Sequence, residues 1–186
     1  MRLAKLVVLI GWLQLSTPVA GEALLAADPN KIKAAFLRNF AHYVMWPDGA
    51  FASADAPWHV CVVGPDPFGS VLDDTLSGRT EQGRAFQVFR AATLERLPSC
   101  QILYIALDDP SERQAALAAL KRRPVLSVSD ADGFLEEGGM IQFQVGERVE
   151  MSVNLDQAKA AALRIQTKML EVSRRVLENG MLRTPR

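Results

Sequence analysis

The sequence predicts an α/β fold, a Rossmann-like layered sandwich with helices on both faces of a mostly parallel sheet of about five to six strands. Between residues 58 and 128, short apolar runs alternate with segments of helical periodicity, a pattern typical of parallel strands joined by right-handed crossovers. Two further strand-like runs, 140–145 and 148–153, flank a tight turn at Gly146-Glu147. They predict an antiparallel hairpin at one edge of the sheet.

The first element is a helix that begins at Asp28 and ends before Pro47. Asp28 can cap it, Pro29 suits its first turn, and apolar residues recur at spacings of three and four. Strands are predicted at 58–63, 85–90, 101–105 and 124–128. Shorter helices are expected from the loop 64–69 to Ser77 and from Asp109 to Arg122.

A long final helix is predicted from Asn154 to about Glu178, with Asn179-Gly180 as its stop. Its apolar stripe would pack on the sheet, or alternatively serve a partner or a second copy, since three leucines form another row at seven-residue spacing. The stripe contains Ala158, Ala162, Ile165, Met169, Val172 and Val176, and the second row Leu163, Leu170 and Leu177.

Residues 1–20 have the layout of a secretory signal peptide. Arg2 and Lys5 precede an apolar run from Leu6 to Leu15, and small residues follow it. The run is shorter than the roughly 20 residues that a membrane span needs. We therefore expect cleavage between about residues 20 and 27, a single domain at 28–180, and a periplasmic location.

Composition excludes some classes of function. The 21 basic and 21 acidic residues balance, which is not typical of a nucleic-acid-binding protein. In an oxidising compartment the two cysteines, Cys61 and Cys100, are more typical of a disulfide than of a metal site. Two buried free thiols are the alternative.

Ligands of open α/β sheets gather at the carboxyl ends of the parallel strands. The three loops at these ends are 64–69, 106–111 and 129–134. Capped strand-to-helix turns are the simpler interpretation, and no dinucleotide or Walker motif occurs in them. The candidate ligand-binding residues are Gly64, Asp66, Phe68, Ser129 and Asp130.

Catalytic chemistry is not indicated. His42 and His59 are the only histidines, no Gly-x-Ser-x-Gly elbow occurs, and no metal-ligand spacing is recognisable. Asp108-Asp109 is better explained by Asp109 capping the next helix than by a carboxylate pair. We expect no catalytic residue, no metal and no cofactor, and hence a binding or regulatory protein rather than an enzyme.

Several motifs, in order along the chain, resemble the YfiR family of periplasmic proteins. They include the helix from Lys33 to Ala41 with Trp46-Pro47, the loop Gly64-Pro65-Asp66-Pro67-Phe68-Gly69, and the positions of Cys61 and Cys100. Later motifs are Ser127-Val128-Ser129-Asp130, Gly133-Phe134, Gly138-Gly139-Met140-Ile141 and Val153-Asn154-Leu155.

The resemblance implies a Rossmann-like periplasmic domain, often a homodimer, that represses a membrane-bound diguanylate cyclase by binding its periplasmic portion. Cyclic-di-GMP signalling, and with it biofilm formation, would then decrease. A further cysteine pair found in characteristic members is absent here. The alternative function is a small-molecule binding or sensing module without a cyclase partner. Residues expected on a partner or dimer surface are Phe36, Phe40, Tyr43, Trp46, Leu163, Leu170 and Leu177.

Overall fold

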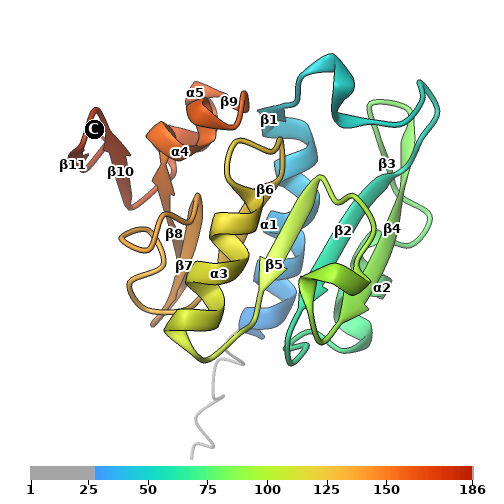
Figure 1. The fold of residues 1–186 in the computed structure, drawn as a ribbon, viewed down its shortest axis with the longest axis horizontal. Helices are drawn as coiled ribbons and strands as arrows, with labels where there is room; N and C mark the ends of the chain where they lie inside the picture. Colours follow the sequence, from blue (N-terminus) through green and yellow to red (C-terminus); the bar gives the residue numbers. More distant parts are fainter. Residues whose placement is uncertain (1–27, 186) are drawn as a thin grey trace, which may run out of the picture.

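The computed structural model describes residues 28–185, in which a nine-stranded sheet carries helices on both faces (Figure 1). The helices are α1 (Pro29–Tyr43), α2 (Ser70–Leu76), α3 (Pro110–Leu120), α4 (Leu155–Ala160) and α5 (Thr167–Glu171), with single turns η1 (Asp48–Ala50) and η2 (Leu94–Arg96). The strands are β1 (Val44–Met45), β2 (Trp58–Val63), β3 (Thr80–Glu81), β4 (Arg84–Ala91), β5 (Ile102–Ile105), β6 (Leu126–Ser129), β7 (Ile141–Val145), β8 (Val149–Asn154), β9 (Arg164–Ile165), β10 (Arg175–Glu178) and β11 (Met181–Arg183).

The order of strands in the large sheet is β11-β10-β8-β7-β6-β5-β2-β4-β3. Strands β4, β2, β5, β6 and β7 pair in parallel, which confirms the mostly parallel sheet. The chain passes from β2 to β4 on one side and then crosses back to β5, β6 and β7 on the other. This is a doubly wound arrangement with β2 at the reversal point.

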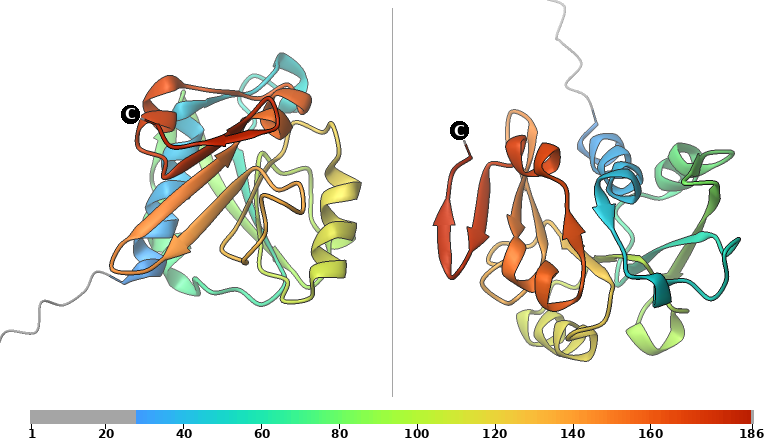
Figure 2. Two further views of the ribbon diagram at one scale, coloured as in Figure 1. Left: turned by 90° about the vertical axis from the view of Figure 1, so that its left-hand side faces the viewer. Right: turned by 90° about the horizontal axis from the view of Figure 1, so that it is seen from above.

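Side chains alternate between the two faces of the sheet, as pleating requires. Val60 and Val62 face one cluster with α1 and α2, whereas Cys61 and Val63 face a second cluster with α3. Figures 1 and 2 show α1 and α3 on opposite sides of the sheet. Helices on both faces are therefore confirmed. Among residues 28–185, no helix combines the length and the apolar character needed to cross a membrane.

Helix α1 forms as the sequence indicates, but it ends earlier than Trp46. The Asp28 carboxylate accepts the backbone N–H of Asn30 at 2.9 Å, and Pro29 occupies the first turn. The helix ends at Tyr43 because Val44 and Met45 leave it to pair with β9. Leu37 is fully buried and Phe40 is almost fully buried against the sheet.

Two predictions about the sheet are wrong. It has nine strands rather than about five to six, and the β7–β8 hairpin is internal rather than at an edge. Strand β10 pairs in parallel with β8, β11 extends this side, and β3 forms the opposite edge. The additional strands have only two to four residues each, so they lack the apolar run by which a strand is recognised.

The prediction of one long helix from Asn154 to Glu178 is also wrong. Asn154 does cap a helix, since its side chain accepts the N–H of Gln157 at 3.1 Å, but α4 ends at Ala160. Ala162 then adopts a left-handed backbone conformation with φ of 58°, and the fully buried Leu163 enters the core. The chain continues as β9, α5, β10 and β11 because pairing with β1 and β8 supplies the backbone hydrogen bonds that a helix would otherwise make.

The leucine row consequently does not exist as one surface. Leu163 is in the core, Leu170 packs against the core from α5, and Leu177 lies in β10. Asn179 and Gly180 turn the β10–β11 hairpin instead of ending a helix. Their backbone N–H groups donate to the carboxylate of Asp156 at 2.8 and 2.9 Å.

The expected disulfide between Cys61 and Cys100 is present. The Cα atoms lie 6.1 Å apart, and the bond links β2 to the segment that enters β5. Cys61 is fully buried and Cys100 is 7% exposed. The bond therefore joins neighbouring strands on the α3 face of the sheet.

We predict that the double variant Cys61→Ala/Cys100→Ala unfolds more easily. The bond closes a chain separation of 39 residues, and the loss of this constraint should lower the free energy of unfolding by about 4 kcal/mol. Urea unfolding followed by tryptophan fluorescence measures the difference. A reductant should destabilise the wild type and leave the double variant unchanged. Equal stability of the two proteins without reductant would contradict the prediction.

Candidate functional site

A cavity of about 500 Å³ lies at the carboxyl ends of β2, β5 and β6. The loop after β2 leads to α2 on one face of the sheet, whereas the loop after β5 leads to α3 on the other. Where consecutive connections diverge in this way, an open α/β sheet leaves a crevice that commonly binds ligands. The structure thus brings together the three loops selected from the sequence.

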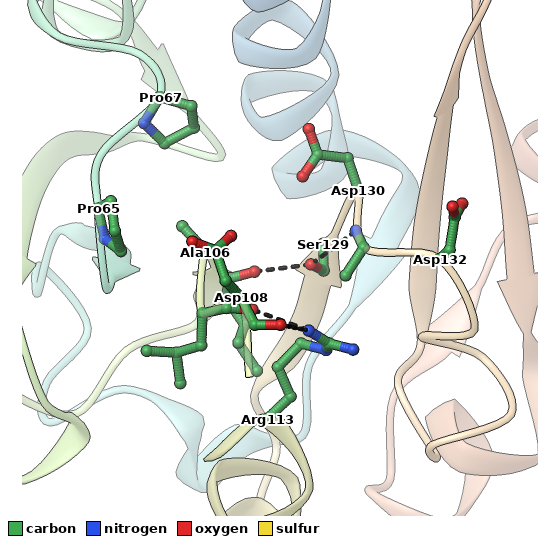
Figure 3. Close-up of a pocket in the computed structure, with 11 residues that line it drawn as sticks. Pro65, Pro67, Ala106, Asp108, Arg113, Ser129, Asp130 and Asp132 are labelled. Carbon is green, nitrogen blue, oxygen red and sulfur yellow. Dashed lines mark hydrogen bonds between the residues drawn. The ribbon is translucent and has the colours of Figure 1, made fainter. Parts of the chain in front are cut away.

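Carboxylates and small apolar groups form most of the cavity wall. Figure 3 shows the prolines of the β2 loop on one side, Asp130 and Asp132 on the other, and Asp108 between them. The Ser129 hydroxyl donates to the carbonyl oxygen of Ile105 at 2.7 Å, which ties the end of β6 to the end of β5. The full lining is Pro65, Pro67, Ile105, Ala106, Leu107, Asp108, Arg113, Ser129, Asp130, Ala131 and Asp132.

The β2 loop is held in place by Arg90 of β4. Arg90 donates through Nε to Asp66 at 2.6 Å and through a terminal nitrogen to the carbonyl oxygen of Gly69 at 2.9 Å. The other Asp66 oxygen accepts the Phe68 N–H at 2.8 Å. Ion pairs with Asp73 first, and then with Asp66, raise the pKa of Arg90 despite its partial burial. Both Asp66 oxygens are therefore occupied within the loop.

Gly64 is required where this loop leaves β2. Its φ is +92°, and an added Cβ would lie 2.9 Å from the carbonyl oxygen of Ala106. A side chain would clash with the neighbouring strand end and strain the backbone. The glycine thus permits the close approach of the β2 and β5 loops.

Lys33 of α1 contacts the cavity wall at Asp130. It is 4% exposed, and its Nζ donates to Asp130 Oδ2 at 2.8 Å. The ammonium lies 5.7 Å from the Phe68 ring centroid and 5.8 Å from that of Tyr104, within the range of cation–π attraction. The pair fastens α1 to the end of β6.

The charged state of Asp130 is favoured by its neighbours. Burial alone would raise the pKa of this carboxyl, but the hydrogen bond from Lys33 and the adjacent Tyr104 hydroxyl outweigh it and lower the pKa. Burial raises the pKa of Tyr104, and the negative charge of Asp130 raises it further. The Tyr104 hydroxyl lies beside Asp130 without a well-aligned hydrogen bond to residues 28–185.

Arg113, which is the cation in the cavity lining, is already engaged. It binds Glu137 with two hydrogen bonds of 2.9 and 2.6 Å and donates to the carbonyl oxygens of Leu107 and Asp108. The bonds to Glu137 raise the pKa of Arg113. This pair attaches α3 to the loop that precedes β7.

The sequence selected five ligand-binding candidates, and the structure divides them. Ser129 and Asp130 line the cavity. Gly64 and Asp66 shape the β2 loop instead, and Phe68 is 3% exposed and stacks on Tyr104 at 4.8 Å. These five candidates did not include Lys33, Asp108 or Asp132. Asp108 and Asp132 are in the loops predicted to hold a site, but Lys33 is on a helix that no local signal connects to those loops.

A second depression, the α1–α5 groove, has a volume of about 450 Å³. Phe36 and Tyr43 line it and are half-buried, whereas Phe40 is almost fully buried in its floor. Phe36 and Phe40 also pack on Phe143 of β7, with ring centroids 5.5 and 6.1 Å apart. The groove is lined by Phe36, Asn39, Phe40, Tyr43, Met151, Lys168, Met169, Glu171 and Val172.

The groove contains some of the predicted surface residues and not others. Trp46 is not in its lining and instead packs against Trp58, with ring centroids 5.0 Å apart. Leu163, Leu170 and Leu177 are likewise outside the lining. Val172, which belongs to the predicted apolar stripe, is 69% exposed and lines the groove.

Both histidines make their contacts outside the cavity and the groove. The His42 ring approaches Glu81 at 3.0 Å, and the His59 ring approaches the carbonyl oxygen of Ser99 at 2.8 Å. Neither lines the cavity or the groove. Within the described part of the chain, no group of three His, Cys, Asp or Glu side chains is arranged to hold a metal ion.

We predict that Asp130→Asn costs more stability than Lys33→Met. Asp130→Asn leaves a buried ammonium without its counter-ion, whereas Lys33→Met leaves a carboxylate that is 37% exposed and can be hydrated. We expect a loss of about 2 kcal/mol for Asp130→Asn, below the range for fully buried pairs because of this exposure, and less than about 1 kcal/mol for Lys33→Met. Urea unfolding measures both. Equal losses would contradict the expectation that the buried ammonium depends on its partner more than the partly exposed carboxylate does.

The same pair predicts a dependence of stability on pH. Because the folded protein lowers the pKa of Asp130, its stabilisation is complete above about pH 4 and is lost as the pH falls through the folded-state pKa. The difference in unfolding free energy between wild type and Asp130→Asn should therefore stay constant above about pH 5 and shrink as the pH falls below about 4 toward the folded-state pKa. A constant difference below about pH 4 would contradict the assignment.

The comparison with protein families agrees with the resemblance of the motifs. A family model described as YfiR/HmsC-like matches residues 30–174. The match begins at the start of α1 and includes every element as far as α5, so both the strand-end cavity and the α1–α5 groove lie within it. Only β10 and β11 lie beyond its end. The chain belongs to the YfiR/HmsC-like family.

Proposed function

We propose that this protein is a periplasmic regulator that binds the periplasmic portion of a membrane diguanylate cyclase, represses it and so lowers cyclic-di-GMP signalling. The observation that carries the proposal is family membership over residues 30–174. The proposed activity is one of binding rather than of catalysis.

The periplasmic location is supported by two features. Residues 1–20, which lie outside the described residues, have the layout of a signal peptide with cleavage between about residues 20 and 27. The Cys61–Cys100 bond suits an oxidising compartment. The domain at 28–180 would then be the mature protein's working part.

The α1–α5 groove is the surface that we assign to the cyclase. Its floor is apolar, because Phe40, Met151 and Met169 are all buried there. Its rim is polar, with Asn39, Lys168 and Glu171. An apolar centre within a polar rim is the arrangement of stable protein interfaces.

Repression follows if the regulator binds one state of the cyclase better than the other. A ligand shifts a two-state equilibrium only by its difference in affinity for the two states. The buried floor of the groove, on α1, β8 and α5, would serve as the fixed surface, and the cyclase would be the partner that changes state. The homodimer that the resemblance implies would place two such grooves in one particle.

We predict that Val172→Asp weakens cyclase binding at least about tenfold. Val172 is 69% exposed, so the substitution should leave folding intact while placing a charge against the apolar centre of the interface. Isothermal titration calorimetry with the purified periplasmic domain of a diguanylate cyclase from the same organism measures the affinity. The matched control is Val145→Asp, at an apolar residue that is 51% exposed at the end of β7, outside the groove.

The possible results separate the surface from the function. Unchanged affinity of Val172→Asp would reject the groove as the binding surface. Failure of the wild type to bind the periplasmic domain of any diguanylate cyclase from the organism would reject the proposed function. Size-exclusion chromatography of the wild type and of both variants reports whether the homodimer exists and whether it uses Val172.

A further inference from the structure

Strand β4 lies open along most of one side. It pairs in parallel with β2 from Phe86 to Ala91, and its other neighbour, β3, pairs only with Arg84 and Ala85. No further strand follows β3 in the sheet order of residues 28–185, and Figure 1 shows β4 beside β2 at the right of the sheet. The stretch Phe86–Ala91 is therefore an open edge of the sheet, which we call the β4 edge.

Alternate residues of the β4 edge direct their backbone groups away from β2. Ala91 faces β2, because its carbonyl oxygen accepts the N–H of Gly64 at 3.0 Å. The N–H and C=O of one strand residue point to the same side, and this side alternates along the chain. Phe86, Val88 and Arg90 therefore direct theirs outward, where no group of residues 28–185 bonds to them. Such a row of unpaired groups is a template for another strand.

The β4 edge lacks features by which proteins commonly block strand addition. These features include proline, lysine and bulges. The stretch 86–91 contains no proline and no lysine, and its register with β2 runs without a bulge. Arg90 carries its one charge, and the Arg90 guanidinium is already bound by Asp66, Asp73 and the carbonyl oxygen of Gly69. The edge is thus open to a second strand.

The side chains of the β4 edge are apolar on both faces of the sheet. Phe86 and Val88 pack against the cluster with α1 and α2, and Phe89 packs against the cluster with α3. All three side chains are nevertheless only half-buried. Pairing with another strand would remove more of this apolar surface from water, which stabilises association.

Charges at the two ends of the edge favour a second, antiparallel copy of the chain. At the β3 end, Arg79 is exposed without an ion pair to residues 28–185, and Arg84 donates only to backbone carbonyl oxygens. At the other end, Asp66 and Asp73 share the single cation Arg90, which leaves that end negative. A two-fold axis across the edge places the positive end of each copy against the negative end of the other. Parallel pairing would place like charges together.

We propose that two copies of the chain join through the β4 edge, with their β4 strands antiparallel about a two-fold axis near Val88. The outward groups of Phe86 then bond to those of Arg90 in the other copy, and those of Val88 bond to their counterparts. Arg79 of each copy approaches Asp73 of the other, and the two sheets become one continuous sheet. No residue of β4 lines the α1–α5 groove, so this pairing is independent of the surface assigned to the cyclase.

Analytical ultracentrifugation of the wild-type protein between about 1 and about 100 µM tests for the dimer. We expect a reversible equilibrium between monomer and dimer in this range. Gln87→Lys should raise the dissociation constant at least about tenfold, because Gln87 is exposed within the edge and lysine opposes strand addition. The matched control is Gln114→Lys, at an exposed residue of α3. The control should dimerise like the wild type.

Proline substitutions separate the edge from the interior of the sheet. Val88→Pro removes an N–H that faces away from β2, so it should raise the dissociation constant at least about tenfold and keep the native circular dichroism spectrum. Phe89→Pro removes an N–H that faces β2, so it should lower the thermal unfolding temperature much more than Val88→Pro does.

Amide hydrogen exchange followed by nuclear magnetic resonance identifies the surface that pairs. In the wild-type dimer, the N–H groups of Phe86, Val88 and Arg90 should exchange at least about tenfold more slowly than in the Gln87→Lys monomer. The N–H of Phe89, which faces β2, should be protected in both proteins. This alternation is specific to pairing through the β4 edge.

A wild type that remains monomeric over the whole concentration range would overturn the proposal. So would a dimer whose affinity is unchanged in both Gln87→Lys and Val88→Pro, or a dimer in which the outward amides exchange as fast as in the monomer, because either dimer must form through another surface. Cyclase binding by Gln87→Lys, measured separately by calorimetry, reports on the proposed function alone. The two proposals can therefore fail independently.

Discussion

The packing of α1 against the sheet is the interaction on which the rest of this structure depends. Leu37 and Phe40 bury almost completely in the core, and Phe40 stacks on Phe143 of β7. At one end of the helix, Lys33 binds Asp130 beyond β6. At the other end, the chain leaves the helix to form β1, which pairs with β9. One helix therefore joins the strand-end cavity, the α1–α5 groove and the C-terminal segment.

The winding of the chain around β2 explains why a cavity is present at all. Hydrogen bonding of β2 to both β4 and β5 sends consecutive connections to opposite faces, so neither connection covers the carboxyl ends of the central strands. Polar residues then hold the loops in place. Arg90 fixes the β2 loop through Asp66, Arg113 fixes the loop before β7 through Glu137, and Ser129 ties β6 to β5. Within residues 28–185 no such bond holds Asp108 or Asp132, so these two side chains make the cavity wall acidic.

The elements that the sequence predicted correctly have strong local signals. The cap at Asp28, the apolar runs of β2, β5 and β6, and the turn at Gly146 are each specified within a few neighbouring residues. The C-terminal segment shows the opposite case. Its apolar spacing suits a helix, yet Ala162 and Val172 of the supposed stripe are exposed while Leu163 is buried. Distant strands, β1 and β8, compete for the same backbone groups, and a periodic pattern contains no information about them.

Local patterns of the sequence predicted the α/β class and the three loops in which a ligand site could form, and they favoured a disulfide between the two cysteines over two free thiols. Which side chains of those loops face a common cavity depends on tertiary packing, which places Asp66 within the β2 loop and Asp108 and Asp132 in the cavity wall. It also brought Lys33 to Asp130 across a sequence separation of 97 residues. The physical reason is that local signals act through the backbone of neighbouring residues, whereas cavities and ion pairs arise where parallel strand ends from distant parts of the chain are hydrogen-bonded side by side.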